Sequence, residues 1–155
     1  IACMEYKKFD KFDFKKFHPG GSLSVKLKTV GDLMLTGKKI PFVSENASMK
    51  AALKVIMKKG LGLIIIRSNR KKTLGILTDG DLKRLNQKFE NFHNLKIKSL
   101  MKKNPISVEK NMLASQALYL MNMKRITSLC VHNGNKNNKT IGVIHIHNIL
   151  NANIS

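Results

Sequence analysis

One eight-residue pattern occurs twice in this chain and constrains its fold more than any other feature. The first copy runs from Gly75 to Leu82 (GILTDGDL) and the second from Gly142 to Ile149 (GVIHIHNI). Each copy is typical of an apolar strand followed by a short helix, and Thr78 and Asp79 stand where a helix N-cap is expected. A helix start can hold an anion, and a carboxylate there can accept from a sugar hydroxyl. The duplication predicts an internal repeat.

The segments around the two copies follow one plan of strand, helix, strand, strand, helix. In the first unit we expect a helical turn at 30–35, strands at 40–43, 61–67 and 74–77, a helix capped by Asn46 or Ser48 and ended by Gly60, and a short helix from Gly80 to about Leu85. In the second unit we expect the corresponding elements at 97–101, 105–108, 126–132, 140–145 and 147–151, with a helix capped by Asn111 that runs to about Lys124.

Neither unit is large enough to bury its own sheet face. Two tandem βαββα units therefore predict an α+β fold in which the units pack about a pseudo-two-fold axis and leave two equivalent clefts between them.

The formal charge of +20, from 29 Lys and Arg against 9 Asp and Glu, invites comparison with nucleic-acid-binding proteins. The positive residues are nearly all Lys and are spread over the whole length. Basic segments interleaved with stacking aromatics, which single-strand binding favours, are absent beyond residue 20. We therefore expect a solvated Lys-rich surface and no nucleic-acid partner, with attraction of a small polyanion as the alternative.

Cysteine usage and the lengths of the apolar runs bear on where the chain works. Cys3 and Cys130 are too few for a disulfide framework and lie in apolar surroundings, which favours a reducing compartment, the cytoplasm. Apolar runs such as Leu63 to Ile66 are far short of the roughly 18 residues that a spanning helix needs, so we expect no membrane partner. Because the chain begins with Ile1 and shows no secretory leader, we expect a piece of a longer protein.

The repeat also carries the marks of a known family. Each unit opens with a similar tripeptide, Asp32-Leu33-Met34 or Ser99-Leu100-Met101, contains an Ala-Leu pair in its longer helix, and closes with the Gly pattern described above. Over about residues 30 to 152 the chain resembles a tandem pair of cystathionine-β-synthase (CBS) domains, one at 30–86 and the other at 97–152. Such pairs are regulatory and bind adenosine or other nucleotides in their clefts, where a Thr or Ser and an Asp three residues on often hold the ribose.

This resemblance implies ligand-binding residues in both units. In the first, Thr78 would bind through its hydroxyl and Asp81 by accepting from a ribose diol; the alternative is that both merely cap the helix. In the second, His145 and Asn148 stand at the corresponding positions, and Asn148 can hydrogen-bond a hydroxyl but adds no charge. Thr127, within an Ile-Thr-Ser motif, completes the set of candidates.

A metal site at the second copy is a weaker hypothesis. His145 and His147 would share a face if the strand continued through both, and could then chelate a metal. No third ligand has a sensible spacing, although a symmetry-related subunit could supply one. The alternative is two histidines that line a cleft, and the sequence implies no required cofactor.

A closer resemblance includes the residues ahead of the repeat. The segment HPGGSL at 18–23, followed by the CBS pair, resembles the C-terminal part of arabinose-5-phosphate isomerases, which carry a sugar-isomerase (SIS) domain ahead of the pair. Those enzymes interconvert D-ribulose 5-phosphate and D-arabinose 5-phosphate and supply Kdo for lipopolysaccharide. Residues 1–22 would then be the tail of the SIS domain, and His18 would transfer protons at its active site. A histidine before Pro-Gly-Gly could equally be an exposed loop residue.

The resemblance predicts a regulatory module that senses a nucleotide or nucleotide sugar, such as AMP, ATP or CMP-Kdo, and acts on its own SIS domain. The chain alone would not isomerise sugar, because the other catalytic residues are not in it. The alternative is a ligand-free module that forms a homodimer and assembles an isomerase tetramer. DNA or RNA binding, a third possibility, predicts an affinity that falls steeply with salt.

Overall fold

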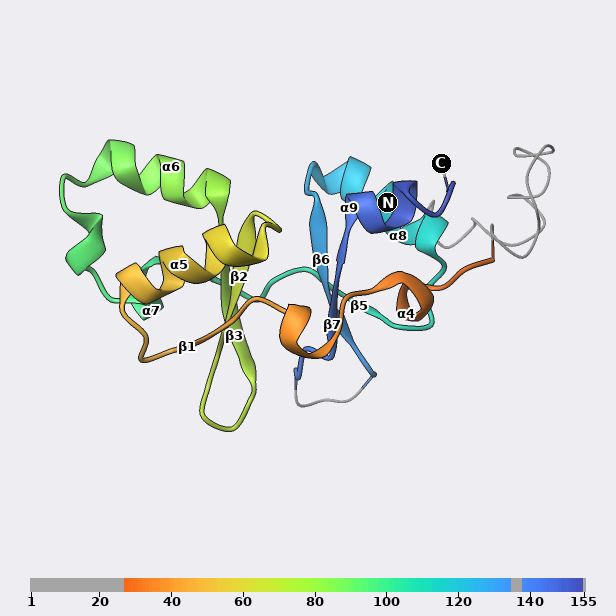
Figure 1. Cartoon of the computed structure of the whole chain (residues 1–155), viewed down its shortest axis with the longest axis horizontal. Helices are drawn as coiled ribbons and strands as arrows, with labels where there is room; N and C mark the ends of the chain where they lie inside the picture. Colours follow the sequence, from red (N-terminus) through yellow and green to blue (C-terminus); the bar gives the residue numbers. More distant parts are fainter. Residues whose placement is uncertain (1–26, 135–137, 155) are drawn as a thin grey trace. The chain divides into compact units, whose positions relative to one another are not determined.

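The computed structural model describes residues 27–134 and 138–154, and the predicted SIS tail with His18 and Cys3 lies outside them. The described residues form an α+β structure that divides into two compact units (Figure 1). Unit 1 contains the described residues up to Leu35 together with 107–134 and 141–154, and unit 2 contains 36–106 and 138–140. None of the helices in the described residues is long and apolar enough to cross a membrane.

The first repeat follows the predicted order of elements. It comprises α4 (Val30–Leu33), the 3-10 helix η1 (Gly37–Lys39), β1 (Phe42–Ser44), α5 (Met49–Lys59), β2 (Leu63–Arg67), β3 (Thr73–Thr78) and α6 (Asp79–Lys88). Of the two cap candidates for α5, Ser48 is the cap, since its hydroxyl accepts from the Ala51 N–H at 3.1 Å. Gly60 ends α5 at a φ of 68°, which glycine adopts at little cost. Helix α6 runs further than predicted, to Lys88.

The second repeat also follows the predicted order of elements, apart from an additional short strand, β4, and one wrongly predicted helix cap. After the 3-10 helix η2 (Phe92–Asn94) come α7 (Ile97–Leu100), β4 (Lys102–Lys103), β5 (Ser107–Glu109), α8 (Ala114–Lys124), β6 (Ser128–His132), β7 (Gly142–His145) and α9 (Ile146–Leu150). The N-cap of α8 is Leu113 and not Asn111, because the Leu113 N–H donates to the Gln116 side chain at 3.2 Å. An acceptor at the third helical position satisfies an N–H group at the helix start without a polar cap residue.

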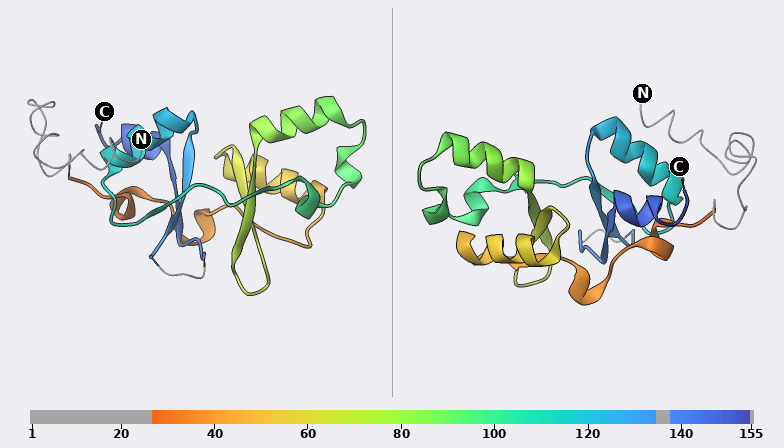
Figure 2. Two further views of the ribbon diagram at one scale, coloured as in Figure 1. Left: turned by 180° about the vertical axis from the view of Figure 1, so that it is seen from behind. Right: turned by 45° about the horizontal axis from the view of Figure 1, so that its top comes forward.

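Each unit has one sheet with its own core. The sheet of unit 2 has the order β1-β2-β3-β4, with β1 parallel to β2 at one edge. Figures 1 and 2 show α5 and α6 on one face of this sheet. The sheet of unit 1 has the order β5-β6-β7, and its core includes Leu118, Met121, Leu129, Ile144 and Ile149.

The compact units do not coincide with the sequence repeats. The difference lies in the leading segments, which are the residues that precede the first strand of each repeat and include α4 in the first and β4 in the second. Helix α4 opens the first repeat but lies in unit 1, where Val30 is fully buried and its N–H donates to the Met112 carbonyl oxygen at 2.7 Å. Strand β4, which the sequence did not predict, precedes β5 but pairs with β3 of unit 2. Each repeat therefore supplies its leading segment to the unit built from the other.

The glycines that open the repeated pattern make room for these leading segments. A Cβ on Gly75 would lie 2.5 Å from the Lys102 carbonyl oxygen and 2.9 Å from the sulfur of Met101. A Cβ on Gly142 would likewise meet the sulfur of Met34. A larger residue would clash with the Lys102 backbone at Gly75 and would displace the Met34 side chain at Gly142, so close packing favours glycine at both positions.

Candidate functional site

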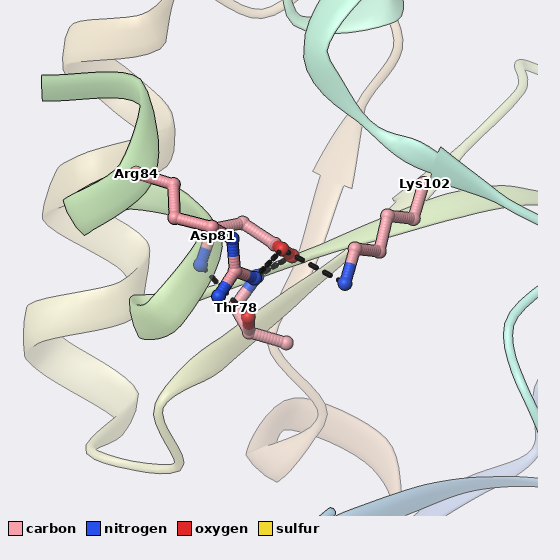
Figure 3. Close-up of polar contacts among 4 residues, drawn as sticks. All are labelled: Thr78, Asp81, Arg84 and Lys102. Carbon is pink, nitrogen blue, oxygen red and sulfur yellow. Dashed lines mark hydrogen bonds and ion pairs between the residues drawn. The ribbon is translucent and has the colours of Figure 1, made fainter. Parts of the chain in front are cut away.

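Thr78 and Asp81 lie together at the start of α6 (Figure 3). The Asp81 N–H donates to the Thr78 hydroxyl at 3.2 Å, and the Thr78 N–H donates to Oδ2 of Asp81 at 3.0 Å. This reciprocal pair is a capping box, which satisfies two N–H groups at the helix start. Both residues therefore stabilise the helix, whether or not they also bind a ligand.

Asp81 has two further contacts that a cap does not need. Its Oδ1 accepts from Nη2 of Arg84 at 2.5 Å and lies 3.0 Å from Nζ of Lys102. Arg84 comes from the next turn of α6 and Lys102 from β4, so the two cations reach the carboxylate from different elements (Figure 3). The Asp81 side chain is 7% exposed, whereas those of Arg84 and Lys102 are 65% and 62% exposed. The cluster therefore combines a buried carboxylate with two solvent-exposed cations.

A second Thr-x-x-Asp box in the chain shows what distinguishes Asp81. At the start of α4 the Thr29 N–H donates to Oδ2 of Asp32 at 2.8 Å, and the Asp32 N–H donates to the Thr29 hydroxyl at 3.3 Å. Asp32 is exposed, and no ion pair among the described residues involves it. The box alone is therefore ordinary helix capping, while burial and the cation pair set Asp81 apart.

The surroundings of Asp81 keep it ionised. Burial raises the pKa of Asp81, but the Thr78 N–H, Lys102, Arg84 and the Thr78 hydroxyl all lower it, and together they hold the pKa below its ordinary value. The carboxylate is charged at neutral pH and can only accept hydrogen bonds. Any ligand group that binds to it must therefore be a donor, such as a hydroxyl.

In unit 1, His145 and Asn148 occupy the positions that correspond to Thr78 and Asp81. The His145 N–H donates to Oδ1 of Asn148 at 2.8 Å, and Nδ1 of His145 accepts from the His147 N–H at 3.1 Å. His145 is the N-cap of α9, just as Thr78 is the N-cap of α6. Because an amide carries no charge, Asn148 cannot form the ion pairs that Asp81 forms.

His145 and His147 lie side by side, but the continuing strand on which the metal hypothesis was based is absent from this part of the structure. Strand β7 ends at His145 and α9 begins at Ile146, so no continuing strand carries both rings. The rings stack with their centroids 4.9 Å apart and 29° between their planes. Burial and the neighbouring His147 lower the pKa of His145. Within residues 27–134 and 138–154, no group of three His, Cys, Asp or Glu side chains could hold a metal ion.

Thr127 is exposed directly ahead of β6. Its carbonyl oxygen accepts from the Ile146 N–H at 2.8 Å, which ties it to the start of α9. In unit 2 the carbonyl oxygen of Gly62 accepts from the Asp79 N–H at 2.9 Å in the same way. Thr127 therefore lies next to the strand residues that pair with His145, at the start of α9.

The sequence analysis did not identify Arg84 or Lys102. Arg84 could have been found, because it is three residues after Asp81 and residues at that spacing are neighbours on a helix. Lys102 gave no local signal, since it belongs to the leading segment of the other repeat.

Comparison with known proteins decides the family. The CBS domain profile matches residues 30–88 and again residues 97–155. The chain belongs to the CBS domain family. Because the profile matches twice, the predicted tandem CBS pair is confirmed.

This CBS pair is similar to proteins named arabinose 5-phosphate isomerase KdsD. It is 39% identical to the Yersinia pestis protein and 37% identical to the Escherichia coli K12 protein, in both cases over 155 residues that cover 99% of this chain and 46% of the relative. It is also 34% identical over 151 residues to the uncharacterised protein RP505 of Rickettsia prowazekii, with coverages of 97% and 46%. The chain thus spans about half the length of the curated relatives it matches.

Solved structures confirm the α+β CBS-pair fold. CBSX2 of Arabidopsis thaliana in complex with AMP has a TM-score of 0.70 at 22% identity, covering 81% of this chain and 95% of that one. The CBS-domain protein ATU1752 of Agrobacterium tumefaciens has a TM-score of 0.71 at 20% identity, with coverages of 83% and 95%. The CBS pair of MJ0100, in complex with 5′-methylthioadenosine and S-adenosyl-L-methionine, has a TM-score of 0.69 at 18% identity, with coverages of 81% and 94%.

Proposed function

We propose that this CBS pair senses a ribonucleotide or nucleotide sugar and regulates an arabinose-5-phosphate isomerase domain. The observation that carries the proposal is the environment of Asp81, a buried and charged acceptor beside the Thr78 hydroxyl and two exposed cations. A ribose diol offers two hydroxyl donors, and a phosphate offers the negative charge that the cations attract. A ribonucleotide carries both groups.

The class of ligand is supported from two directions. The complexes of CBSX2 with AMP and of MJ0100 with 5′-methylthioadenosine and S-adenosyl-L-methionine favour an adenosine ligand such as AMP or ATP. The similarity to KdsD favours CMP-Kdo, an activated sugar from the same pathway that offers a ribose and anionic groups and could act by feedback. In unit 1, Thr127, His145 and Asn148 are the corresponding candidates.

The parent protein that we propose converts D-ribulose 5-phosphate into D-arabinose 5-phosphate in the cytoplasm, for Kdo and lipopolysaccharide synthesis. The support is the identity of 37–39% to KdsD proteins over nearly the whole chain. Residues 1–22 would be the end of the SIS domain, and residues 30–86 and 97–152 its two CBS domains. This chain alone is expected to be inactive on sugar phosphates.

His18 tests the isomerase part of the proposal. In the full-length protein, His18→Ala is expected to retain the fold and lose isomerisation, because an imidazole near pH 7 can give and take the proton that an enediol mechanism moves. His93→Ala is the matched control, since His93 is exposed in η2. Unchanged turnover of the His18 variant would remove this residue from the mechanism.

Isothermal titration calorimetry of this chain with AMP, ATP, CMP and CMP-Kdo tests the sensing part. At least one of them is expected to bind, and Asp81→Asn should weaken that binding about tenfold, because Asn keeps the cap acceptor but loses the charge. Asp32→Asn removes the charge from the exposed box at α4 and should leave binding unchanged. Absence of heat with all four ligands would overturn the sensing proposal.

The second candidate is a ligand-free module that dimerises through its helices and assembles an isomerase tetramer. Two exposed apolar side chains favour it, Met57 on α5 at 80% exposure and Met123 on α8 at 45%. Asp81 also has a partner for each oxygen without any ligand. Light scattering beside the titration separates the candidates, because a dimer that binds none of the four ligands would favour assembly alone.

A further inference from the structure

We propose that Asp81 exchanges partners when a ligand binds, so that the ribose takes its carboxylate while the displaced Lys102 and Arg84 bind the ligand phosphate. This inference rests on the proposed nucleotide sensing and adds a selectivity to it. The site would prefer phosphorylated ribonucleotides to neutral nucleosides, and Lys102 would be a residue that determines this preference.

The carboxylate of Asp81 has little room for another donor. Oδ2 accepts from the Thr78 N–H, and Oδ1 already faces the Arg84 guanidinium and the Lys102 ammonium. The side chain is almost fully buried. One acceptor site on Oδ2 is left, so a ribose diol, which offers two hydroxyl donors, can bind the carboxylate with both only if one of these donors moves away.

The donors differ in how readily they can leave. The Thr78 N–H belongs to the capping box of α6, so losing it would uncap the helix. Arg84 and Lys102 are mostly exposed, and ion pairs with solvent-exposed partners add little to stability. The two cations are therefore the partners that a ligand can displace.

The displaced cations would then need a new counter-charge. Both lie within 3.0 Å of one oxygen atom, so they are close neighbours and repel each other once that oxygen is taken. A phosphate can accept from both at once through its several oxygens. A neutral nucleoside would also displace the cations, but it has no phosphate to which they could bind.

The backbone of Lys102 stays in place during such an exchange. Lys102 pairs with Ile76 in the sheet, and its carbonyl oxygen lies against Gly75. Lys103 follows on the same short strand, where successive side chains point to opposite faces. Lys103 thus has the same charge and a similar exposure but points away from Asp81, which makes it a matched control.

The experiment compares the affinities of AMP and adenosine, and of CMP and cytidine, for the wild type, Lys102→Met and Lys103→Met. Methionine keeps the apolar stem and removes the charge. We expect the wild type to prefer the phosphorylated member of the pair that binds. Lys102→Met should lower that preference about tenfold, with weaker nucleotide binding and equal or tighter nucleoside binding. Lys103→Met should change the preference less than twofold.

Each other outcome overturns the inference in a distinct way. Equal losses of preference in both variants would show that overall charge is responsible rather than Lys102. Equal weakening of nucleotide and nucleoside by Lys102→Met would exclude an exchange of partners. If the wild type binds none of the four compounds, no exchange takes place on these ligands, and failure of CMP-Kdo and ATP as well would also overturn the proposed function. Thermal unfolding of each variant verifies that the fold is retained.

Discussion

Replacing Asp81 by Asn should destabilise the chain by an amount that the structure allows us to work out. Asn keeps an acceptor for the Thr78 N–H, so the cap survives. A negative charge in the first turn of a helix contributes about 0.3–1 kcal/mol. The two ion pairs, whose cations are mostly exposed, contribute about 0.2–1 kcal/mol each. The free energy of unfolding at pH 7 should therefore fall by about 1.5 kcal/mol.

Asp79→Asn separates the ion pairs from the general effect of charge. Asp79 is exposed at the first position of the same helix, so its removal should cost only the helix contribution, about 0.5 kcal/mol. Urea unfolding followed by circular dichroism measures both variants against the wild type. A cost for Asp81→Asn no larger than that for Asp79→Asn would refute the assignment of the ion pairs.

The pH dependence of the same measurement is fixed by the direction of the pKa shift. Because the pKa of Asp81 is lowered in the folded state, its charge contributes its full stabilisation at pH values above the unfolded-state pKa of about 3.9. That stability is lost as the pH falls through the lower folded value. The difference in free energy of unfolding between the wild type and Asp81→Asn should be constant from about pH 7 to 5 and should decrease below about pH 4. A gap that widens on acidification would contradict this reasoning.

Three further substitutions test packing and capping. Gly75→Ala should destabilise unit 2 by about 1–3 kcal/mol because the new Cβ would clash with the Lys102 carbonyl oxygen. Gly80→Ala, whose Cβ would meet nothing closer than 3.6 Å, should be neutral or stabilising, as thermal melts can verify. Burial and the neighbouring His147 lower the pKa of His145 in the folded state. The contribution of neutral His145 to the free energy of unfolding is therefore complete above the unfolded-state pKa of about 6.5, and it is lost as the pH falls toward the lower folded-state pKa. Asn at position 145 can also cap α9 but does not titrate. The urea midpoint of His145→Asn should therefore fall less than that of the wild type when the pH is lowered from 7.5 to 5.5. Equal decreases in the two proteins would contradict this prediction.

Most of the fold could be predicted because its signals are local. The Ser48 cap and the Gly60 terminator are each set by residues within one or two turns of helix α5. The wrong cap at Asn111 shows the limit of choosing a cap by residue type, since the side chain of Gln116 supplies the acceptor from inside the helix. The metal hypothesis depended on a strand that continues through His147, but β7 ends two residues earlier, at His145.

The features that the sequence could not predict depend on contacts between distant segments. Strand β4 has only two residues and forms because β3 offers it a partner beside Gly75. Lys102 reaches Asp81 only through that pairing. The pairing of Thr78 with Asp81, by contrast, follows from a spacing of three residues at a helix start, so it could be predicted.

The sensing site is tested most directly by a two-dimensional 1H–15N NMR titration of this chain with AMP, ATP, CMP and CMP-Kdo in turn. We expect one of these ligands to shift the backbone amide signals of Thr78, Asp81 and Lys102 most strongly, and Asp81→Asn to reduce those shifts at the same subsaturating concentration. A titration in which these three amides stay unchanged while others shift would place the ligand elsewhere and contradict the central claim.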